Sequence, residues 1–94
     1  MATFIMFGKY TAKAMEGMEP GRTAKAIALM ERFGGKVKSI YAMLGETDLL
    51  IIADYPGNEA AMKASLALAK ATGLSFVTSP AVSVEQFDKM IAEV

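Results

Sequence analysis

The chain has 94 residues with ten basic and ten acidic side chains, a formal net charge of zero, and neither cysteine nor histidine. A chain of this length makes one small domain, which leaves roughly a third or more of its unfolded-chain surface exposed unless it associates with another chain. The balanced charge predicts no nucleic-acid or membrane partner, and the missing thiols and imidazoles exclude disulfides, thiolate nucleophiles and most transition-metal sites.

The first predicted strand, Thr3–Lys9, is apolar on both faces. Successive side chains of a strand point to opposite sides. Apolar side chains occupy both sets, with Phe4 and Met6 on one face and Ile5 and Phe7 on the other. The N-terminal segment has no basic region before its apolar run and no long apolar stretch, so we expect no signal peptide, no membrane span and a cytoplasmic location.

A polar passage and then a helical period follow. Residues 10–21 are punctuated by glycine, and Thr11 is suited to cap one helical turn there. The period becomes helical over Arg22–Phe33 and ends at Gly34-Gly35. The apolar side chains of this helix share one side: Ala26, Ile27, Leu29, Met30 and Phe33. Its start, residues 21–23, can bind an anion through free amides, although it lacks the spacing of a phosphate loop.

Two further strands, Lys36–Leu44 and Asp48–Tyr55, are predicted to form a hairpin across the polar break at residues 45–48. From Leu49 to Ala53 the second of them is apolar at odd and even positions alike. Both of its faces must therefore be covered. Helices of the same chain can cover one face, and we expect a second copy of the chain to cover the other.

The next segments predict a helix and a short strand. Glu59–Thr72 is rich in alanine, and small residues allow a helix to pack closely on a sheet. Ser75–Ser79 is predicted as a fourth strand that ends at Pro80, because proline cannot donate a hydrogen bond to the ladder.

An amphipathic helix is predicted over residues 83–94. Ser83 and Gln86 match a capping box. Apolar side chains recur along it at helical spacing: Phe87, Met90, Ile91 and Val94. We expect a single domain over residues 1–94 with its core in 1–80, and a terminal helix that takes part in assembly or in covering the core.

The order of elements is strand, helix, strand, strand, helix, strand and a last helix. With right-handed crossovers, this order predicts a ferredoxin-like βαββαβ sandwich of the α+β class. Its antiparallel sheet has helices on one side only. We therefore expect a homo-oligomer that forms through the other sheet face.

The hairpin also carries a family resemblance. Gly45 and Asp48 match the glycine and aspartate of the motif that names the GYD domain family, and Thr47 stands at the tyrosine position. With Tyr41 before the hairpin and the run from Ala53 to Pro56 after it, the chain resembles that family over nearly its whole length. The resemblance implies a ferredoxin-like subunit related to dimeric α+β barrels, without a settled reaction or settled catalytic residues.

Three polar side chains are candidates for contacting a small apolar or anionic ligand: Tyr10, Tyr41 and Asp48. A tyrosine has an apolar ring and a polar tip, which suits a cavity between sheets, but core packing with one hydrogen bond is the plainer alternative. For Asp48 the plainer alternative is a bond to backbone amides near the turn. Asp54 shares a face with apolar side chains and needs a partner if buried, although an exposed strand end explains it more simply.

Two classes of function are consistent with these features. A non-enzymatic oligomeric module, either a scaffold or a small-molecule binder, accounts for the two-sided strands and the missing catalytic residues. The alternative is a cofactor-independent enzyme of the dimeric α+β barrel type, such as a monooxygenase or an isomerase, that uses the tyrosines and the aspartate in an intersubunit pocket. We expect no metal and no cofactor in either case, because the acidic side chains are dispersed.

Overall fold

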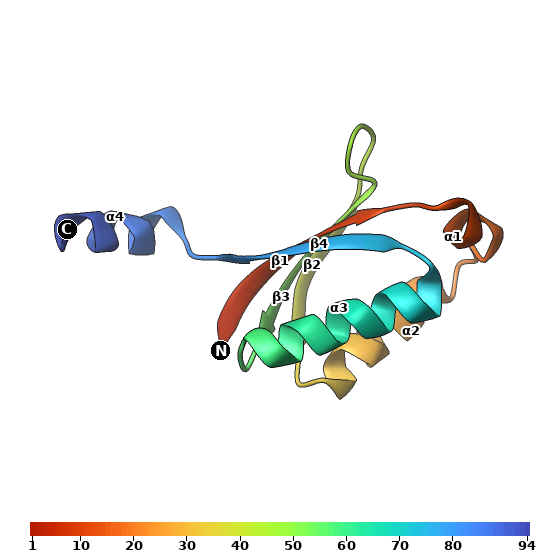
Figure 1. Ribbon diagram of the computed structural model, residues 1–94, viewed down its shortest axis with the longest axis horizontal. Coiled ribbons are helices and arrows are strands. Elements are labelled where there is room, and N and C mark those ends of the chain that lie inside the picture. The colour runs from red at the N-terminus through yellow and green to blue at the C-terminus, as the bar shows by residue number, and fades with distance from the viewer.

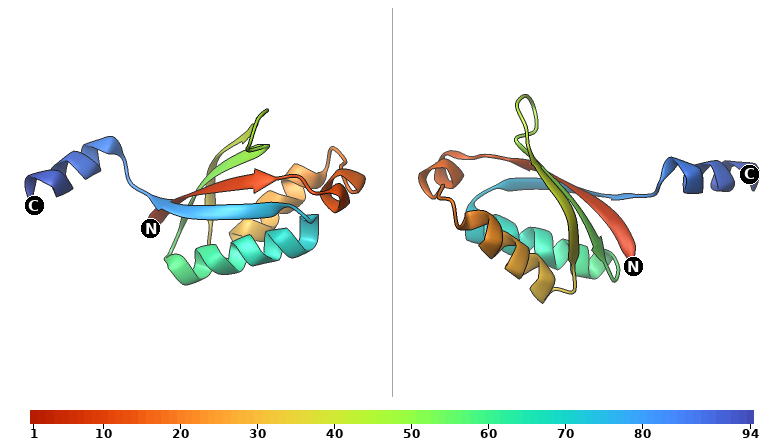
Figure 2. Two further views of the ribbon diagram at one scale, coloured as in Figure 1. Left: turned by 45° about the horizontal axis from the view of Figure 1, so that its top comes forward. Right: turned by 180° about the vertical axis from the view of Figure 1, so that it is seen from behind.

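A computed structural model describes all 94 residues and shows one four-stranded antiparallel sheet with two long helices on one side (Figures 1 and 2). The elements in chain order are β1 (Ala2–Lys9), α1 (Ala12–Glu16), α2 (Arg22–Arg32), β2 (Lys36–Ala42), β3 (Leu49–Tyr55), α3 (Asn58–Thr72), β4 (Ser75–Ala81) and α4 (Val84–Ala92). The strands lie in the order β2-β3-β1-β4. The predicted ferredoxin-like α+β fold is confirmed.

The core lies between the sheet and helices α2 and α3. Its buried side chains are Phe4, Met6, Met30, Ile51, Ala53, Tyr55, Ala61, Ala64 and Leu68. The rings of Phe4 and Tyr55 meet edge to face with centroids 5.9 Å apart. Alanines on the buried side of α3 allow that helix to lie close to the sheet. The predicted helices over both segments are therefore confirmed, and the apolar side of each helix faces the core.

The two glycines that follow α2 let the backbone lie directly against core residues. A Cβ atom added to Gly35 would lie 2.6 Å from Tyr55 Cε1 and 2.9 Å from the Met30 carbonyl oxygen. Both distances are shorter than real Cβ contacts, so only glycine fits this position. Gly34 has a φ of 83°, in the left-handed region that glycine adopts at helix ends.

The sheet face opposite the helices is uncovered in the single chain (Figure 2). The register places apolar side chains of three strands side by side on this open face: Ile5 and Phe7 of β1, Leu50 and Ile52 of β3, and Val77 of β4. Phe7 is 37% exposed and Val77 is 64% exposed. The two-sided pattern read from the sequence thus corresponds to one face under helices and one face without them.

Three predicted strand ends are wrong, two at the hairpin and one at β4. The strands of the hairpin stop at Ala42 and restart at Leu49, and Asp48 bonds to the end of β1, where its amide donates to the Gly8 carbonyl at 2.9 Å and its carboxylate accepts from the Tyr10 amide. The hairpin loop is therefore longer than expected, and the Met43 amide closes it by donating to the Asp48 carbonyl at 2.8 Å. Pro80 does not end β4, since the strand stays paired with β1 to Ala81. β4 is an edge strand, where a missing N–H is tolerated when it faces away from the neighbouring strand.

The two short helices at the ends of the sheet also form. The predicted turn after β1 is α1, and the Ala14 amide donates to Thr11 Oγ1 at 3.1 Å, as expected for a cap. In α4 the Gln86 amide donates to Ser83 Oγ at 3.1 Å. α4 projects from the end of β4, away from the helices, and has no buried residue (Figure 1). It does not cover the core of its own chain, and no helix is both long and apolar enough to span a membrane.

Candidate functional site

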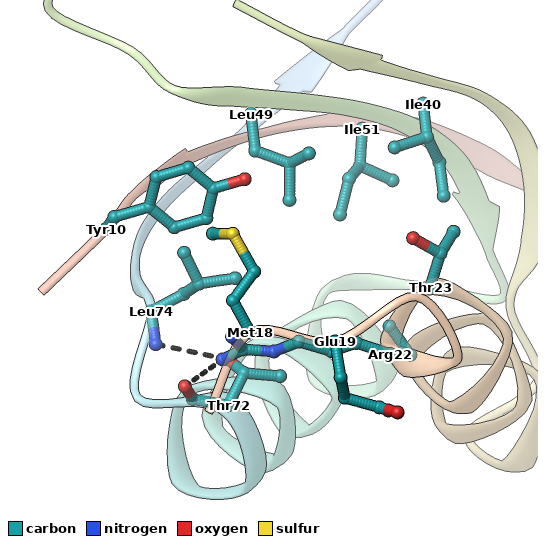
Figure 3. A pocket seen from close by; sticks show the side chains of 11 residues that line it. Tyr10, Met18, Glu19, Arg22, Thr23, Ile40, Leu49, Ile51, Thr72 and Leu74 are labelled. Atoms are coloured by element: carbon teal, nitrogen blue, oxygen red, sulfur yellow. Dashed lines mark hydrogen bonds between the residues drawn. The ribbon is translucent and has the colours of Figure 1, made fainter. Parts of the chain in front are cut away.

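A pocket of about 120 Å³ lies between the sheet and the start of α2 (Figure 3). Its lining comprises Tyr10, Met18, Glu19, Arg22, Thr23, Ala26, Ile40, Leu49, Ile51, Thr72 and Leu74. Ile40, Leu49 and Ile51 come from β2 and β3 and form an apolar floor, because alternate residues of these strands face the helix layer. The polar groups come from the loop before α2, the first turn of α2 and the end of α3.

Arg22 is the central polar residue of this pocket. Its Nη1 donates to the Ala14 carbonyl at 2.5 Å and its Nη2 donates to the Thr72 carbonyl. The guanidinium therefore holds α1 and the end of α3 against the first turn of α2. The ion pairs of the molecule join Lys25 to Glu19, Lys38 to Asp54 and Lys63 to Glu59, so Arg22 forms no ion pair, although Glu19 lines the same pocket.

Hydrogen bonds at the end of α3 fix the neighbouring wall. Thr11 Oγ1 donates to the Gly73 carbonyl at 2.7 Å, and the Leu74 amide donates to Thr72 Oγ1 at 3.1 Å. Gly73 has a φ of 77°, and a Cβ there would lie 3.2 Å from the Ala14 amide nitrogen. Glycine therefore lets the segment around α1 lie directly against the end of α3, which closes this side of the pocket.

The three candidate residues lie in different places. The Tyr10 side chain lines the pocket and its hydroxyl points inward (Figure 3). Asp48 Oδ2 accepts from the Tyr10 amide at 2.9 Å, so Asp48 positions Tyr10 through its backbone, and the amide that it binds lies beyond the end of β1 and not near the turn, as the structural alternative had it. Tyr41 is 55% exposed, and pairs with Leu50 on the open face. Within one chain, Tyr41 is therefore separated from Tyr10 by the sheet.

The sequence reasoning missed most of the polar rim. The sequence predicts that residues 21–23 can bind an anion through free amides, whereas the group that lines the pocket is the Arg22 side chain. Met18 and Thr72 were not predicted as lining residues. The sequence around Arg22 does not indicate that its side chain lies in the pocket. The position of the Arg22 side chain depends on contacts with Ala14 and with the end of α3, 50 residues away along the chain.

Asp54 lies on the open face and is not a freely exposed strand end. Its side chain is 18% exposed, Oδ1 accepts from Thr3 Oγ1 at 2.6 Å, and Oδ2 lies 3.6 Å from Lys38 Nζ. The hydrogen bond from Thr3, followed by the charge of Lys38, lowers the pKa of the Asp54 carboxyl below its usual range. The prediction that Asp54 needs a partner is therefore the correct one. Asp54 places a charged side chain at the margin of the apolar open face.

The structure holds no group of three or more acidic, histidine or cysteine side chains placed to bind a metal ion. The polar groups of the pocket are one guanidinium, one phenol hydroxyl, two threonine hydroxyls and the Glu19 carboxylate, around an apolar floor. Such a set suits recognition of a small molecule with one polar or anionic end.

Comparison with solved structures identifies the class of fold. Over 87% of its length the chain is similar to the leucine response regulatory protein LrpA of Mycobacterium tuberculosis, with a TM-score of 0.58 and 12% identity. It is also similar to a putative glycine cleavage system transcriptional repressor, with a TM-score of 0.56 and 19% identity over 87% of the chain. The match covers 51% and 46% of those chains, so this chain spans about half their length. At these identities the likeness shows a shared α+β fold.

Sequence comparison then identifies the family. A model of the GYD domain matches residues 4–91. The chain therefore belongs to the GYD domain family, and the resemblance drawn from the hairpin and its flanking strands is confirmed at the level of the family. No curated protein sequence matches the chain.

Proposed function

We propose that this GYD domain is a non-enzymatic, homo-oligomeric module that binds a small organic acid in the pocket beside Arg22. The observation that carries the proposal is a guanidinium at the rim of an apolar pocket with no carboxylate partner. An arginine presents five N–H donors and matches a carboxylate in a bidentate pair. Two backbone carbonyls occupy part of this capacity and leave a positive charge for a ligand to neutralise.

The size of the pocket sets the ligand class. A cavity of roughly 150 Å³ lined by apolar side chains holds a molecule the size of benzene. The pocket here is about 120 Å³, so the ligand has few heavy atoms. Its carboxylate would contact Arg22, and a short apolar tail would contact Leu49 and Ile51.

The oligomeric part of the proposal rests on the open face. Phe7, Leu50 and Ile52 form an apolar surface with no cover in one chain. Two copies that meet face to face would cover it, in the manner of dimeric α+β barrels, and would bring Tyr41 into the space between subunits. We therefore still predict that Tyr41 contacts a ligand in a cavity between the subunits. We place the assembly in the cytoplasm.

The enzyme alternative receives less support from the geometry. It uses Tyr10, Tyr41 or Asp48 in a pocket between subunits, whereas the Asp48 carboxylate binds the Tyr10 backbone and Tyr10 lines a pocket within one chain. A binding role needs only the groups that the pocket already brings together.

Calorimetry and NMR titration with short carboxylic acids test the binding proposal. Propionate and butyrate should bind, and the corresponding amides should bind at least ten-fold more weakly, because charge-assisted hydrogen bonds are about twice as strong as neutral ones. Ala26→Leu fills the pocket while the Arg22 side chain stays in place, and it should abolish binding while the fold is retained. Arg32→Met, at the other end of α2, is the matched control and should bind as the wild type does. Equal affinity for acids and amides, or unchanged binding by Ala26→Leu, would contradict the proposal.

A further inference from the structure

α4 presents an apolar stripe that its own chain leaves uncovered. The stripe consists of Phe87, Met90, Ile91 and Val94, and the exposed fractions of the first three are 50%, 47% and 54%. In the views of Figures 1 and 2 the helix lies apart from the sheet and from both long helices. A helix with one apolar side in this position needs a partner surface for that side.

A hollow of about 400 Å³ between α3 and β4 offers an apolar surface that could receive this stripe. We call it the β4 groove, and its apolar lining is Phe4, Ala61, Met62, Leu66, Phe76 and Pro80. Met62 and Leu66, one turn apart on α3, are 64% and 65% exposed. The groove follows the line where α3 meets the edge strand β4, and the Ser65 and Thr78 hydroxyls, 2.7 Å apart, join the two elements along it.

The dimensions of α4 suit this groove. From Phe76 to Pro80 the strand that forms its floor runs for about 13 Å at 3.3 Å per residue. The nine residues of α4 span about 14 Å at 1.5 Å per residue. Side chains spaced like Phe87 and Ile91, one turn apart, would interdigitate with Met62 and Leu66, which have the same spacing.

The charges are complementary as well. Residues 84–94 contain three acidic side chains and one basic side chain, whereas residues 1–83 contain seven acidic and nine basic side chains. The helix is therefore net negative and the rest of the chain net positive. Lys70 lies one turn beyond Leu66 on α3, at the end of the groove. The acidic polar side of α4 also disfavours an anionic membrane as its partner surface.

The path of the chain directs α4 to another molecule. β4 stays paired with β1 through Ala81, and only Val82 and Ser83 precede the helix. Ser83 is extended, with φ −64° and ψ 156°, and its cap bond to the Gln86 amide fixes the helix start. α4 consequently leaves in the direction of the strand and away from its own groove (Figure 1). We propose that α4 of one copy occupies the β4 groove of a second copy, so that the arms link the subunits.

Because the chain lacks cysteine, single introduced cysteines can test this contact directly. Isotope-labelled Leu66→Cys chain is mixed with unlabelled Ile91→Cys chain, oxidised and analysed by mass spectrometry. The expected product is a mixed covalent dimer of two 10.0 kDa chains. Lys25→Cys, on the exposed side of α2, replaces Leu66→Cys in the control. Equal yields from the two pairings would overturn the proposal.

The doubly substituted chain, Leu66→Cys with Ile91→Cys, separates the possible occupants of the groove. Docking between copies gives covalent dimers and larger species. An internally bridged monomer as the main product would show that α4 folds back onto its own groove, and would overturn the proposal.

Phe87→Asp, added to the Ile91→Cys chain, should lower the yield of mixed dimer by about ten-fold, the effect of losing one interface anchor. Gln86→Asp adds the same charge on another side of the helix and should leave the yield unchanged. Equal yields with Phe87→Asp and Gln86→Asp would also count against the contact.

Discussion

Tyr55 shows how strongly the core restricts a single side chain. Its ring is fully buried against Phe4, and its hydroxyl donates only a weak bond to Met6 Sδ at 3.5 Å. Burial disfavours the charged form and raises the pKa of Tyr55 from 10.0 to about 12. A raised pKa in the folded state means that the stabilisation is complete below pH 10.0 and is lost as the pH rises through about 12.

We therefore predict that part of the alkaline loss of stability comes from Tyr55. The melting temperature of the wild type should fall more between pH 10 and pH 12 than that of Tyr55→Phe, which has no hydroxyl to ionise. Identical curves for the wild type and Tyr55→Phe would show that Tyr55 does not titrate in the folded core.

Gly35 gives a second prediction for a single residue. Gly35→Ala places a methyl group against the Tyr55 ring and the Met30 carbonyl, and we expect it to lower the free energy of unfolding by about 1–3 kcal/mol, as overpacking does. Chemical denaturation measures the change. Gly17→Ala is the control, because a Cβ at Gly17 meets no atom closer than 3.9 Å and its φ is −91°. A loss as large in the control would indicate a general cost of removing glycine.

At the scale of elements, local patterns predicted most of the fold. The period of 3.6 in α2 and the alternation in β1 and β3 come from which side chains face the core, so they are visible in sequence. The end of β4 was not predictable in this way, since the effect of Pro80 depends on β4 being an edge strand. The loop of the hairpin depends on Asp48 bonding to Tyr10, which is a contact between distant segments.

The candidate site was predictable only in part, for the same reason. Tyr10 follows a strand at a position that faces the helix layer, and the alternation rule finds it. Arg22 lies in the pocket because α1 and the end of α3 offer it carbonyl oxygens, and no pattern near residue 22 encodes that arrangement. The position of α4 likewise depends on the absence of contacts, which a sequence pattern does not contain.

At the scale of the whole molecule, the open face predicts the state of association. Val77 is exposed on this face, so Val77→Lys should leave the fold intact and place a charge in the interface between two sheets. We expect light scattering to give a dimer or larger species for the wild type at micromolar concentration and a smaller species for Val77→Lys. Leu44→Lys, at the 99% exposed position in the hairpin loop, is the matched control and should associate normally. A wild type that is monomeric at 10.0 kDa would refute association through this face.

The bond between Asp48 and the backbone of Tyr10 has a spectroscopic consequence. The Tyr10 amide donates its proton to a carboxylate at the base of the hairpin, with 2.9 Å between the nitrogen and Asp48 Oδ2, and not to a carbonyl of a neighbouring strand. Its side chain meanwhile lines the pocket. Occupancy of the pocket would therefore register at this one amide, as a change in its chemical shift and in its rate of exchange with deuterium. The signal would persist in Tyr10→Phe, because the reporter belongs to the main chain.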